Sequence, residues 1–329
     1  PFVAGGDARG ESVADFVARR LGPEVVDALV GPFLTGVYAG DERRLGAEAV
    51  FPSLVELERQ HGSLVRGGLV RLLRRQRSAP GLRGIWSTAE GLGGLASGLA
   101  ERLGASLSLE QRVVSLAKDA DGFVLEVEGS AGSATWRARR VVLATDAGGA
   151  ARLARPLDAE AAAALEEIPF APVVSVSVGV APGALSIPLD GFGFLVPRGE
   201  KASVLGVLFM STLFPGRAPD GRALLTIMLG GLRRPGLVDA SDAELRERVE
   251  EDLVRTLGLG EAPVWLGAGR WPQAVPQPGP EHPRRMARLR ARLGRHGPLA
   301  LAGAYVAGVG VSDTLASGAT AARELLASR

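Results

Sequence analysis

The run Leu301-Ala302-Gly303-Ala304-Tyr305-Val306-Ala307-Gly308-Val309-Gly310-Val311-Ser312-Asp313 gives the clearest indication of the fold. An apolar strand enters a glycine-rich turn, and a helix is expected to begin near Ser312. Because glycine has no side chain, backbone N–H groups and the helix dipole at such a turn can approach an anion or an electron-rich ring edge. The run therefore predicts either a ligand-binding turn or an ordinary strand–turn–helix connection.

The segments around this run alternate between strands and helices. Before it we expect a strand at Val264 to Ala268, an arginine-rich helix near Pro283 to Leu293 and a strand at Pro298 to Ala302. The final helix should end at about Leu326. A second α/β zone covers about Leu82 to Ala154, with these expected elements: helix Leu92 to Leu103, strand Ser106 to Leu109, a hairpin of Phe123 to Val127 with Thr135 to Ala138, and a buried strand Val141 to Thr145.

A strand-rich zone from Ala171 to Gly231 separates these two α/β zones, and a helical zone from Glu11 to about Gln76 precedes both. The expected elements of the strand-rich zone are runs at Val173 to Val178, Phe192 to Val196, Val204 to Met210 and Ala223 to Leu229, followed by a helix at Asp242 to Leu257. This order predicts an α/β (α+β) fold in which an antiparallel sheet is inserted into a discontinuous α/β domain. We expect domain limits at residues 1–81, 82–152, 153–263 and 264–329.

Composition excludes several classes of protein. The 329 residues are 46% apolar and 22% charged with a net charge of +2, which is not the composition of a disordered or nucleic-acid-binding chain. Without cysteine there is no disulfide scaffold, and only His61, His282 and His296 are histidines, so no metal site is expected. The longest apolar run, Leu299 to Val311, is shorter than the roughly 20 residues of a membrane-spanning helix. Since the chain begins with Pro1, we expect it to be part of a longer protein.

Short motifs add little that is specific. Residues Gly91 to Ala96 fit G-x-G-x-x-A, but neither a preceding strand nor a suitably placed acidic residue supports a dinucleotide site there. Of two basic stretches, Arg66 to Arg77 fits a membrane-surface contact and Arg284 to Arg295 fits a solvated amphipathic helix. Hydrolase, metalloprotease and Walker sequences are lacking. Either the chain is not an enzyme or a cofactor carries its chemistry.

A set of short segments, in this order and spacing, carries a resemblance to a known family. They are Arg20 to Val25, Gly36 to Asp41, Phe51 to Leu54, Glu90 to Leu95, Gly191 to Pro197, Leu213 to Pro219, Met228 to Gly231, Ala274 to Gln277 and the turn Gly308 to Asp313. Through them the whole chain resembles the C-terminal two-thirds of the oxygen-dependent protoporphyrinogen oxidases, within the monoamine-oxidase-like flavoproteins.

The resemblance implies an FAD-dependent oxidoreductase of haem biosynthesis. Protoporphyrinogen IX would be oxidised to protoporphyrin IX by hydride transfer from the macrocycle to flavin N5, and O2 would become H2O2. Residues 82–152 and 264–329 would form the FAD-binding domain, and residues 153–263 the substrate-binding domain. The implied cofactor positions are Val113, Trp271, Val309, Gly310 and Val311. The implied substrate positions are Phe192, Leu195, Phe214 and Met228, with no catalytic side chain and no metal.

The resemblance also implies a location and marks some departures. Residues 1–81 would be a helical membrane-associated domain, so the protein is expected in the cytoplasm, peripherally at the inner face of the cell membrane, with a homodimer as the family's common state. The family's G-x-G-x-x-G strand and its usual pocket arginine are missing, so this chain alone should not hold FAD. Ser312 and Ala316 stand where the family commonly has asparagine and an acidic residue.

Two alternatives and one choice of substrate stay open. The first alternative is a related flavin oxidase of an amine or a carotenoid precursor. The two tyrosines of the chain, Tyr38 and Tyr305, argue against the aromatic cage that amine oxidation would favour. The second is a non-catalytic module that binds a membrane surface. Sequence alone does not distinguish protoporphyrinogen from coproporphyrinogen as the substrate.

Overall fold

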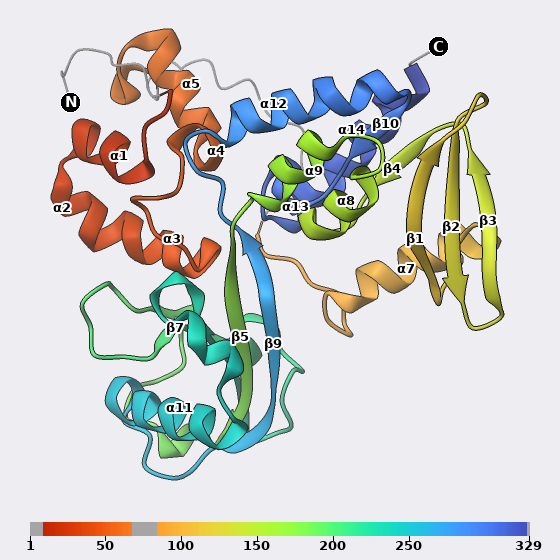
Figure 1. Ribbon diagram of the computed structural model, residues 1–329. Coiled ribbons are helices and arrows are strands. Elements are labelled where there is room, and N and C mark those ends of the chain that lie inside the picture. The colour runs from red at the N-terminus through yellow and green to blue at the C-terminus, as the bar shows by residue number, and fades with distance from the viewer. Residues whose placement is uncertain (1–8, 68–83, 328–329) are drawn as a thin grey trace.

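The computed structural model describes residues 9–67 and 84–327 (Figure 1). The described chain forms a helical part near the N-terminus, a five-stranded antiparallel sheet with one long helix, and an α/β part with two smaller sheets. The expectation of a mixed α/β fold with antiparallel sheets is therefore confirmed. Among the helices in these ranges, none is long and apolar enough to cross a membrane.

The five-stranded sheet has the order β6-β7-β8-β5-β9, and every neighbouring pair is antiparallel. Its strands are β5 (Phe170–Val180), β6 (Gly193–Leu195), β7 (Val204–Phe209), β8 (Ala223–Gly230) and β9 (Val264–Pro276). Helix α11 (Asp242–Leu257) covers one face, where Val176 and Ile227 are fully buried against Leu245 and Val249. Alternate residues of β5 and β8 point to the other face and are only partly buried. One face is thus a packed core, and the other is accessible.

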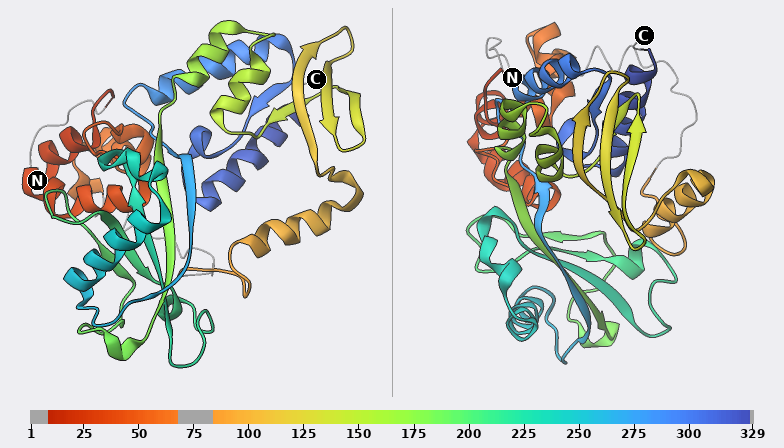
Figure 2. Two further views of the ribbon diagram at one scale, coloured as in Figure 1. Left: turned by 60° about the horizontal axis from the view of Figure 1, so that its bottom comes forward. Right: turned by 45° about the vertical axis from the view of Figure 1, so that its right-hand side comes forward.

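The α/β part is built around two short parallel strands, β4 (Val141–Leu143) and β10 (Leu299–Leu301). One buried core draws on residues from Leu116 to Ile168 and from Met286 to Tyr305, so chain segments on both sides of the five-stranded sheet pack together. Its helices are α7 (Gly93–Leu103), α8 (Ala147–Ala154), α9 (Ala159–Glu166), α12 (His282–Leu293), α13 (Ala304–Ala307) and α14 (Val311–Ala327). The strands β1 (Gln111–Lys118), β2 (Phe123–Gly129) and β3 (Gly132–Ala138) form a separate antiparallel sheet (Figure 2).

The helical part has its own core, with Val13, Phe16, Leu34 and Leu45 fully buried. Its elements are α1 (Val13–Leu21), α2 (Pro23–Val25), the π-helical turn η1 (Val26–Val30), α3 (Gly31–Tyr38), α4 (Ala47–Val50) and α5 (Pro52–His61). Shorter elements elsewhere are α10 (Met210–Leu213) and the 3₁₀ turns η2 (Gly104–Ser106), η3 (Pro182–Ala184), η4 (Gly231–Arg233), η5 (Pro235–Asp239) and η6 (Gly294–His296).

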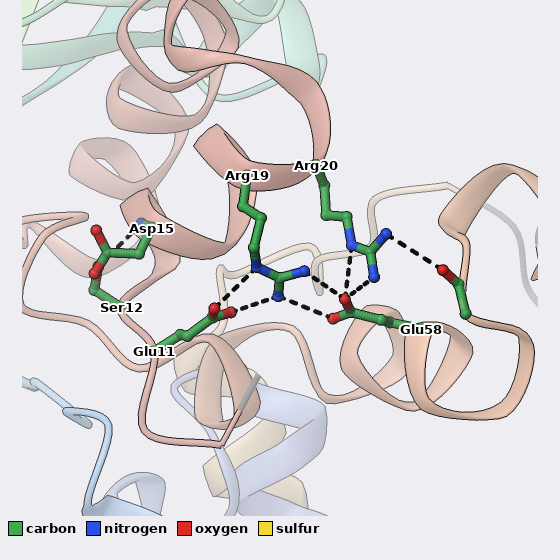
Figure 3. A network of polar contacts seen from close by, with 7 residues as sticks. Glu11, Ser12, Asp15, Arg19, Arg20 and Glu58 are labelled. Atoms are coloured by element: carbon green, nitrogen blue, oxygen red, sulfur yellow. Dashed lines mark hydrogen bonds and ion pairs between the residues drawn. The ribbon is translucent and has the colours of Figure 1, made fainter. Parts of the chain in front are cut away.

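A buried ion network joins α1 to α5 in the helical part (Figure 3). The Glu58 carboxylate accepts hydrogen bonds from Arg19 Nη1 and Arg20 Nε, each at 2.6 Å, and Arg19 also pairs with Glu11. The Glu58 and Arg20 side chains are only 2% and 3% exposed. Burial raises the pKa of Glu58, but the hydrogen bonds from Arg19 and Arg20 outweigh this effect and leave that pKa lowered. Glu58 is therefore an ionised, buried connection between the two helices.

Several expected elements agree with the structure and some do not. The hairpin, the helix Asp242 to Leu257 and the strand runs of the sheet are confirmed. The expected strand at Ser106 to Leu109 is wrong, because Gly104 to Ser106 form a 3₁₀ turn and the strand begins at Gln111. The last strand before α12 extends to Pro276 and pairs with β5, so residues 264–276 lie in the antiparallel sheet. Most of the stretch Arg66 to Arg77 falls outside the described residues.

Candidate functional site

The glycine-rich turn follows the carboxyl end of β10, beside the carboxyl end of its parallel neighbour β4. Gly303 and Gly308 have φ values of 136° and 138°, a backbone conformation that favours glycine. At the end of β4, Asp146 caps α8 by accepting the N–H of Gly149 at 2.7 Å. In open α/β sheets, ligands bind outside the carboxyl ends of neighbouring strands. This edge therefore has the geometry of a cofactor crevice.

Side chains from α14 hold the turn in shape. Ser317 Oγ accepts the N–H of Gly303 at 2.9 Å and donates to the carbonyl oxygen of Thr314 at 2.7 Å. The Asp313 carboxylate lies over the turn, so a Cβ placed on Gly310 would be 2.7 Å from its Oδ2. Any side chain at Gly310 would push this carboxylate aside. The turn thus presents backbone rather than side chains.

A small pocket of about 230 Å³ lies behind the turn, lined by residues that include Val309, Met286, His282 and Tyr305. His282 Nε2 lies 2.8 Å from the carbonyl oxygen of Tyr305. Burial lowers the pKa of His282, while burial and the nearby Asp146 carboxylate raise the pKa of the Tyr305 hydroxyl. His282 Nδ1 and Tyr305 Oη have no hydrogen-bond partner among the described residues. Both side chains are therefore neutral near pH 7.

The accessible face of the five-stranded sheet presents a row of residues from neighbouring strands. Strand register places Leu195, Gly206, Met228, Ser175 and Gly269 in this row. Gly206 separates the large side chains of Leu195 and Met228, whereas Ser175 and Gly269 are two small neighbours. The face therefore combines apolar side chains with the hydroxyls of Ser175, Ser177 and Thr226, and it leaves gaps above Gly206 and Gly269.

Two of the predicted residues fit into these gaps. Leu195 Cδ2 packs closely against Gly206 and against Gly36 of α3. A Cβ added to Gly36 would lie 2.5 Å from Leu195 Cδ2. The Trp271 ring lies over Gly269, where a Cβ would collide with it. About half of the Trp271 side chain (51%) stays exposed. The glycines therefore orient an exposed aromatic ring on the sheet face and a leucine at the junction with the helical part.

The turn and the sheet face adjoin through the C-terminal half of β9. In this half of β9 the Gln273 side chain lies beside α8, since a Cβ added to Gly148 would be 3.9 Å from Gln273 Oε1. Gln273 is two residues along β9 from Trp271. Val275 and Val309 both pack against the buried core of the helical part. All three parts of the molecule thus meet where β9 passes between the turn and the helices.

The structure distributes the predicted site residues unequally over this junction. Trp271 and the turn residues Val309, Gly310 and Val311 lie at it, and Leu195 and Met228 share the sheet row. Phe192 is half exposed just before β6, and Phe214 follows α10 beyond the end of β7. Val113 is half-buried against the α/β core, beside a bulge in β1. The roles of all nine residues stay predictions.

Sequence reasoning missed three residues at the junction. Asp146 directly follows a buried apolar strand and caps the next helix, a signal that was present in the sequence. Asp313 lies in the first turn of α14, and its position over the glycines required the fold. Gln273 gave no signal, because the expected strand ended at Ala268. No group of histidine, aspartate and glutamate able to hold a metal occurs among the described residues.

Comparison with known proteins identifies relatives over the whole described chain. A family model described as flavin-containing amine oxidoreductase matches residues 8–326. The chain is 36% identical over 322 residues to the chloroplastic protoporphyrinogen oxidase of Oryza sativa subsp. japonica, covering 92% of this chain and 60% of that protein. It is 28% identical over 329 residues to the coproporphyrinogen III oxidase of Bacillus subtilis (strain 168), covering 96% of this chain and 67% of that protein.

A solved structure agrees with these relatives. The crystal structure of a candidate protoporphyrinogen oxidase from Exiguobacterium sp. 255-15 has a TM-score of 0.76 and 25% sequence identity, covering 96% of this chain and 67% of that one. The chain spans 60% of the length of the rice protein. The resemblance drawn from the short segments is confirmed by these matches.

Proposed function

The chain belongs to the flavin-containing amine oxidoreductases, and we propose that the complete protein is an FAD-dependent oxidase of protoporphyrinogen IX. The substrate would lose six hydrogen atoms to give protoporphyrin IX, while three O2 molecules become three H2O2. The proposal rests on one observation above all. The glycine-rich turn at the ends of β4 and β10 adjoins, through β9, an accessible sheet face that presents Leu195, Met228 and Trp271.

The residues at the turn fit a flavin cofactor. FAD, when bound, supplies the two-electron acceptor that no side chain of this protein can provide. The turn offers the backbone of Val309, Gly310 and Val311 at the start of a 17-residue helix, and no side chain at Gly310 obstructs it. Trp271 would flank the cofactor, and the backbone of Val113 would meet its adenine end. Because one core joins segments from both sides of the sheet, we propose that the FAD-binding domain is discontinuous.

The sheet face suits the body of a porphyrinogen. A large, mostly apolar macrocycle needs a wall that orients it and excludes water. Leu195 and Met228 provide such a wall in the sheet row, and Phe192 and Phe214 extend it toward the ends of β6 and β7. Oriented binding, rather than a strong side-chain base, is then the main contribution of these residues. The buried tyrosines, Tyr38 and Tyr305, are not available for an aromatic cage, which argues against an amine substrate.

We also propose peripheral contact of the helical part with the inner face of the cell membrane. Leu29, Phe33 and Val37 follow a helical spacing along η1 and α3, and between 42% and 66% of each side chain is exposed. Such a stripe can enter the apolar boundary of a lipid layer. Cosedimentation with anionic vesicles should fall when Leu29 and Phe33 are changed to serine. An unchanged bound fraction would reject this contact.

The oxidase is tested by porphyrin fluorescence. Protoporphyrinogen IX is supplied in air to the complete protein, and flavin content is measured on the same sample. A fluorescence rise that depends on bound FAD, with stoichiometric H2O2, supports the proposal. A protein that keeps FAD but gives no rise is a different flavin oxidase, and a protein with neither is a binding module.

A pair of glycine variants tests the turn itself. Gly310→Ala should lower flavin content, because its Cβ would displace the Asp313 carboxylate, whose Oδ2 would otherwise lie 2.7 Å away, and would add a side chain where the turn presents its backbone. Gly318→Ala in the same helix meets no atom within 4 Å and serves as the matched control. Equal flavin content in the two variants would show that the turn is not part of the cofactor site.

A further inference from the structure

Three hydroxyl side chains lie together in the middle of the accessible sheet face. Thr226 of β8 belongs to this face, because its neighbours Leu225 and Ile227 are fully buried on the face that α11 covers (Figure 1). Along β5, Ser175 and Ser177 alternate in the same way with buried valines. Strand register pairs Ser177 directly with Thr226. The three hydroxyls therefore form one polar group on the sheet face.

The spacing of this group follows from strand geometry. Directly opposed residues of antiparallel strands have Cβ atoms about 5 Å apart, so this separation applies to Ser177 and Thr226. Ser175 lies two residues from Ser177 along β5, which corresponds to about 7 Å. A single ligand the size of a tetrapyrrole can therefore reach all three hydroxyls.

Apolar side chains surround this polar group. Met228 of β8 is the strand partner of Ser175, and Leu208 of β7 is the strand partner of Thr226. On the β9 side, the Trp271 ring lies over the glycine that pairs with Ser175. The hydroxyls thus lie between Met228, in the proposed substrate wall, and Trp271, the proposed neighbour of the flavin.

None of the three hydroxyls is hydrogen-bonded to another group in the part of the chain that the structure describes. Other hydroxyls of the same region have partners: Thr212 Oγ1 donates to the Leu189 carbonyl oxygen at 2.7 Å, and Thr35 Oγ1 accepts from Arg233 at 2.8 Å. Each oxygen of the group therefore keeps its lone pairs available to a ligand. Such acceptors in an apolar wall select a ligand that is apolar in outline but carries N–H or O–H groups.

We propose that Ser175, Ser177 and Thr226 are specificity residues, which accept hydrogen bonds from the pyrrole N–H groups of the substrate. This inference rests on the proposed function and deepens it, because it makes the polar centre of a porphyrinogen the recognised group. The methylene bridges of a porphyrinogen are tetrahedral, so its pyrrole rings tilt and can turn their N–H groups toward one side of the macrocycle. The porphyrin product is flat, and its remaining N–H groups point to the ring centre. The sheet face therefore binds the reduced macrocycle more tightly than the oxidised one.

Two competing roles predict other ligand preferences. Hydroxyls that donate to the carboxylate arms would treat substrate and product alike, because both macrocycles carry the same two arms. Hydroxyls that meet only solvent would contribute to the binding of neither macrocycle. A comparison of protoporphyrinogen IX with protoporphyrin IX therefore separates the three roles.

The test measures binding to the complete protein without oxygen and with its flavin reduced beforehand, so that no turnover occurs. The protein retains the ligand during ultrafiltration, and the retained amount is read as porphyrin fluorescence, after oxidation in the case of protoporphyrinogen IX. In Ser175→Ala, Ser177→Ala and Thr226→Val, the Kd for protoporphyrinogen IX should rise about fivefold, the loss expected for one neutral hydrogen bond. The Kd for protoporphyrin IX and the flavin content should stay unchanged.

Two further variants control for the substitutions themselves. Thr226→Ser keeps the hydroxyl and should retain the wild-type Kd for protoporphyrinogen IX. Ser133→Ala removes an exposed strand hydroxyl from the separate sheet of β1, β2 and β3, and it should change neither Kd.

Each outcome decides between the roles. An equal rise of both Kd values would assign the hydroxyls to the carboxylate arms, and unchanged values would leave them to solvent; either result overturns the proposal. If the wild-type protein binds protoporphyrinogen IX but does not oxidise it in air, the proposed function fails, and the pattern of Kd values still decides the role of the hydroxyls. A wild-type protein that binds neither macrocycle overturns both.

Discussion

Replacing Glu58 by glutamine should destabilise the helical part by about 3 kcal/mol, because it removes the carboxylate that pairs with the buried Arg20 guanidinium. The two side chains are 2% and 3% exposed, so water cannot solvate the remaining charge (Figure 3). Arg19 adds little to this loss, because it is 23% exposed and keeps its pair with Glu11 at 2.7 Å. The amide of glutamine still accepts a hydrogen bond, which places the cost at the lower end of the usual range of about 3–5 kcal/mol.

Amide hydrogen exchange measures this loss where it occurs. At about 1.4 kcal/mol for each factor of ten, exchange in α1 and α5 should accelerate roughly 100-fold, while β5 and β8 keep their rates. The double variant Arg20→Met with Glu58→Leu removes both charges and should regain most of the stability. An acceleration below about fivefold in Glu58→Gln would refute the reasoning, since it would mean that water reaches Arg20. Equal acceleration in β5 would instead assign the effect to global unfolding.

Three further predictions follow from other parts of the structure. Gly193→Ala should lower the free energy of unfolding in urea by about 3 kcal/mol or more, because the φ of Gly193 is 137° and the new Cβ would collide with the Val207 carbonyl oxygen. Gly236→Ala is the control, because its Cβ would meet no atom within 4 Å. Asp158→Asn keeps the cap of α9 but loses the ion pair with Arg292 at 2.9 Å. At pH 7 the free energy of unfolding of this variant should therefore be about 1 kcal/mol lower than that of the wild type. Since Arg292 lowers the pKa of Asp158 from 3.8 to about 2, this difference should vanish as the pH falls from 3.8 toward 2. Burial lowers the pKa of His282 below 6.5, so the unfolded state binds the extra proton and stability should fall as the pH drops below 6.5. His282→Gln should flatten that decline in urea titrations, and an unchanged slope would count against it.

Local sequence patterns correctly predicted those helices and strands whose own residues specify their structure. The helix Asp242 to Leu257 has apolar residues at intervals of four and a serine cap before it, and both features are intrinsic to its sequence. The hairpin of β2 and β3 likewise shows alternation around a short glycine-flanked turn. Where a segment satisfies its hydrogen bonds locally, its sequence is sufficient to identify it.

The site depended on contacts between segments that lie far apart in the chain. Leu195 is placed by Gly36 and Gly206, and Val309 packs with residues of the helical part near the opposite end of the chain. No local pattern records such contacts, because each partner alone looks like an ordinary core residue. The residues of the predicted site were found through a family resemblance, and their individual roles await the experiments above.

Strand β9 explains why the junction in particular was missed. The sequence from Gly267 to Pro272 contains glycines and a proline, which normally end a strand, so the expected strand stopped at Ala268. Within residues 9–67 and 84–327, β9 pairs with β5 alone and is an edge strand, and an edge position tolerates proline because one side needs no ladder hydrogen bond. A bulge opposite, between Ala171 and Val173, absorbs the irregular register. The tolerance of the edge lets the strand continue to Pro276, and only this continuation brings Gln273 beside Gly148 of α8 and Pro276 beside the glycine-rich turn.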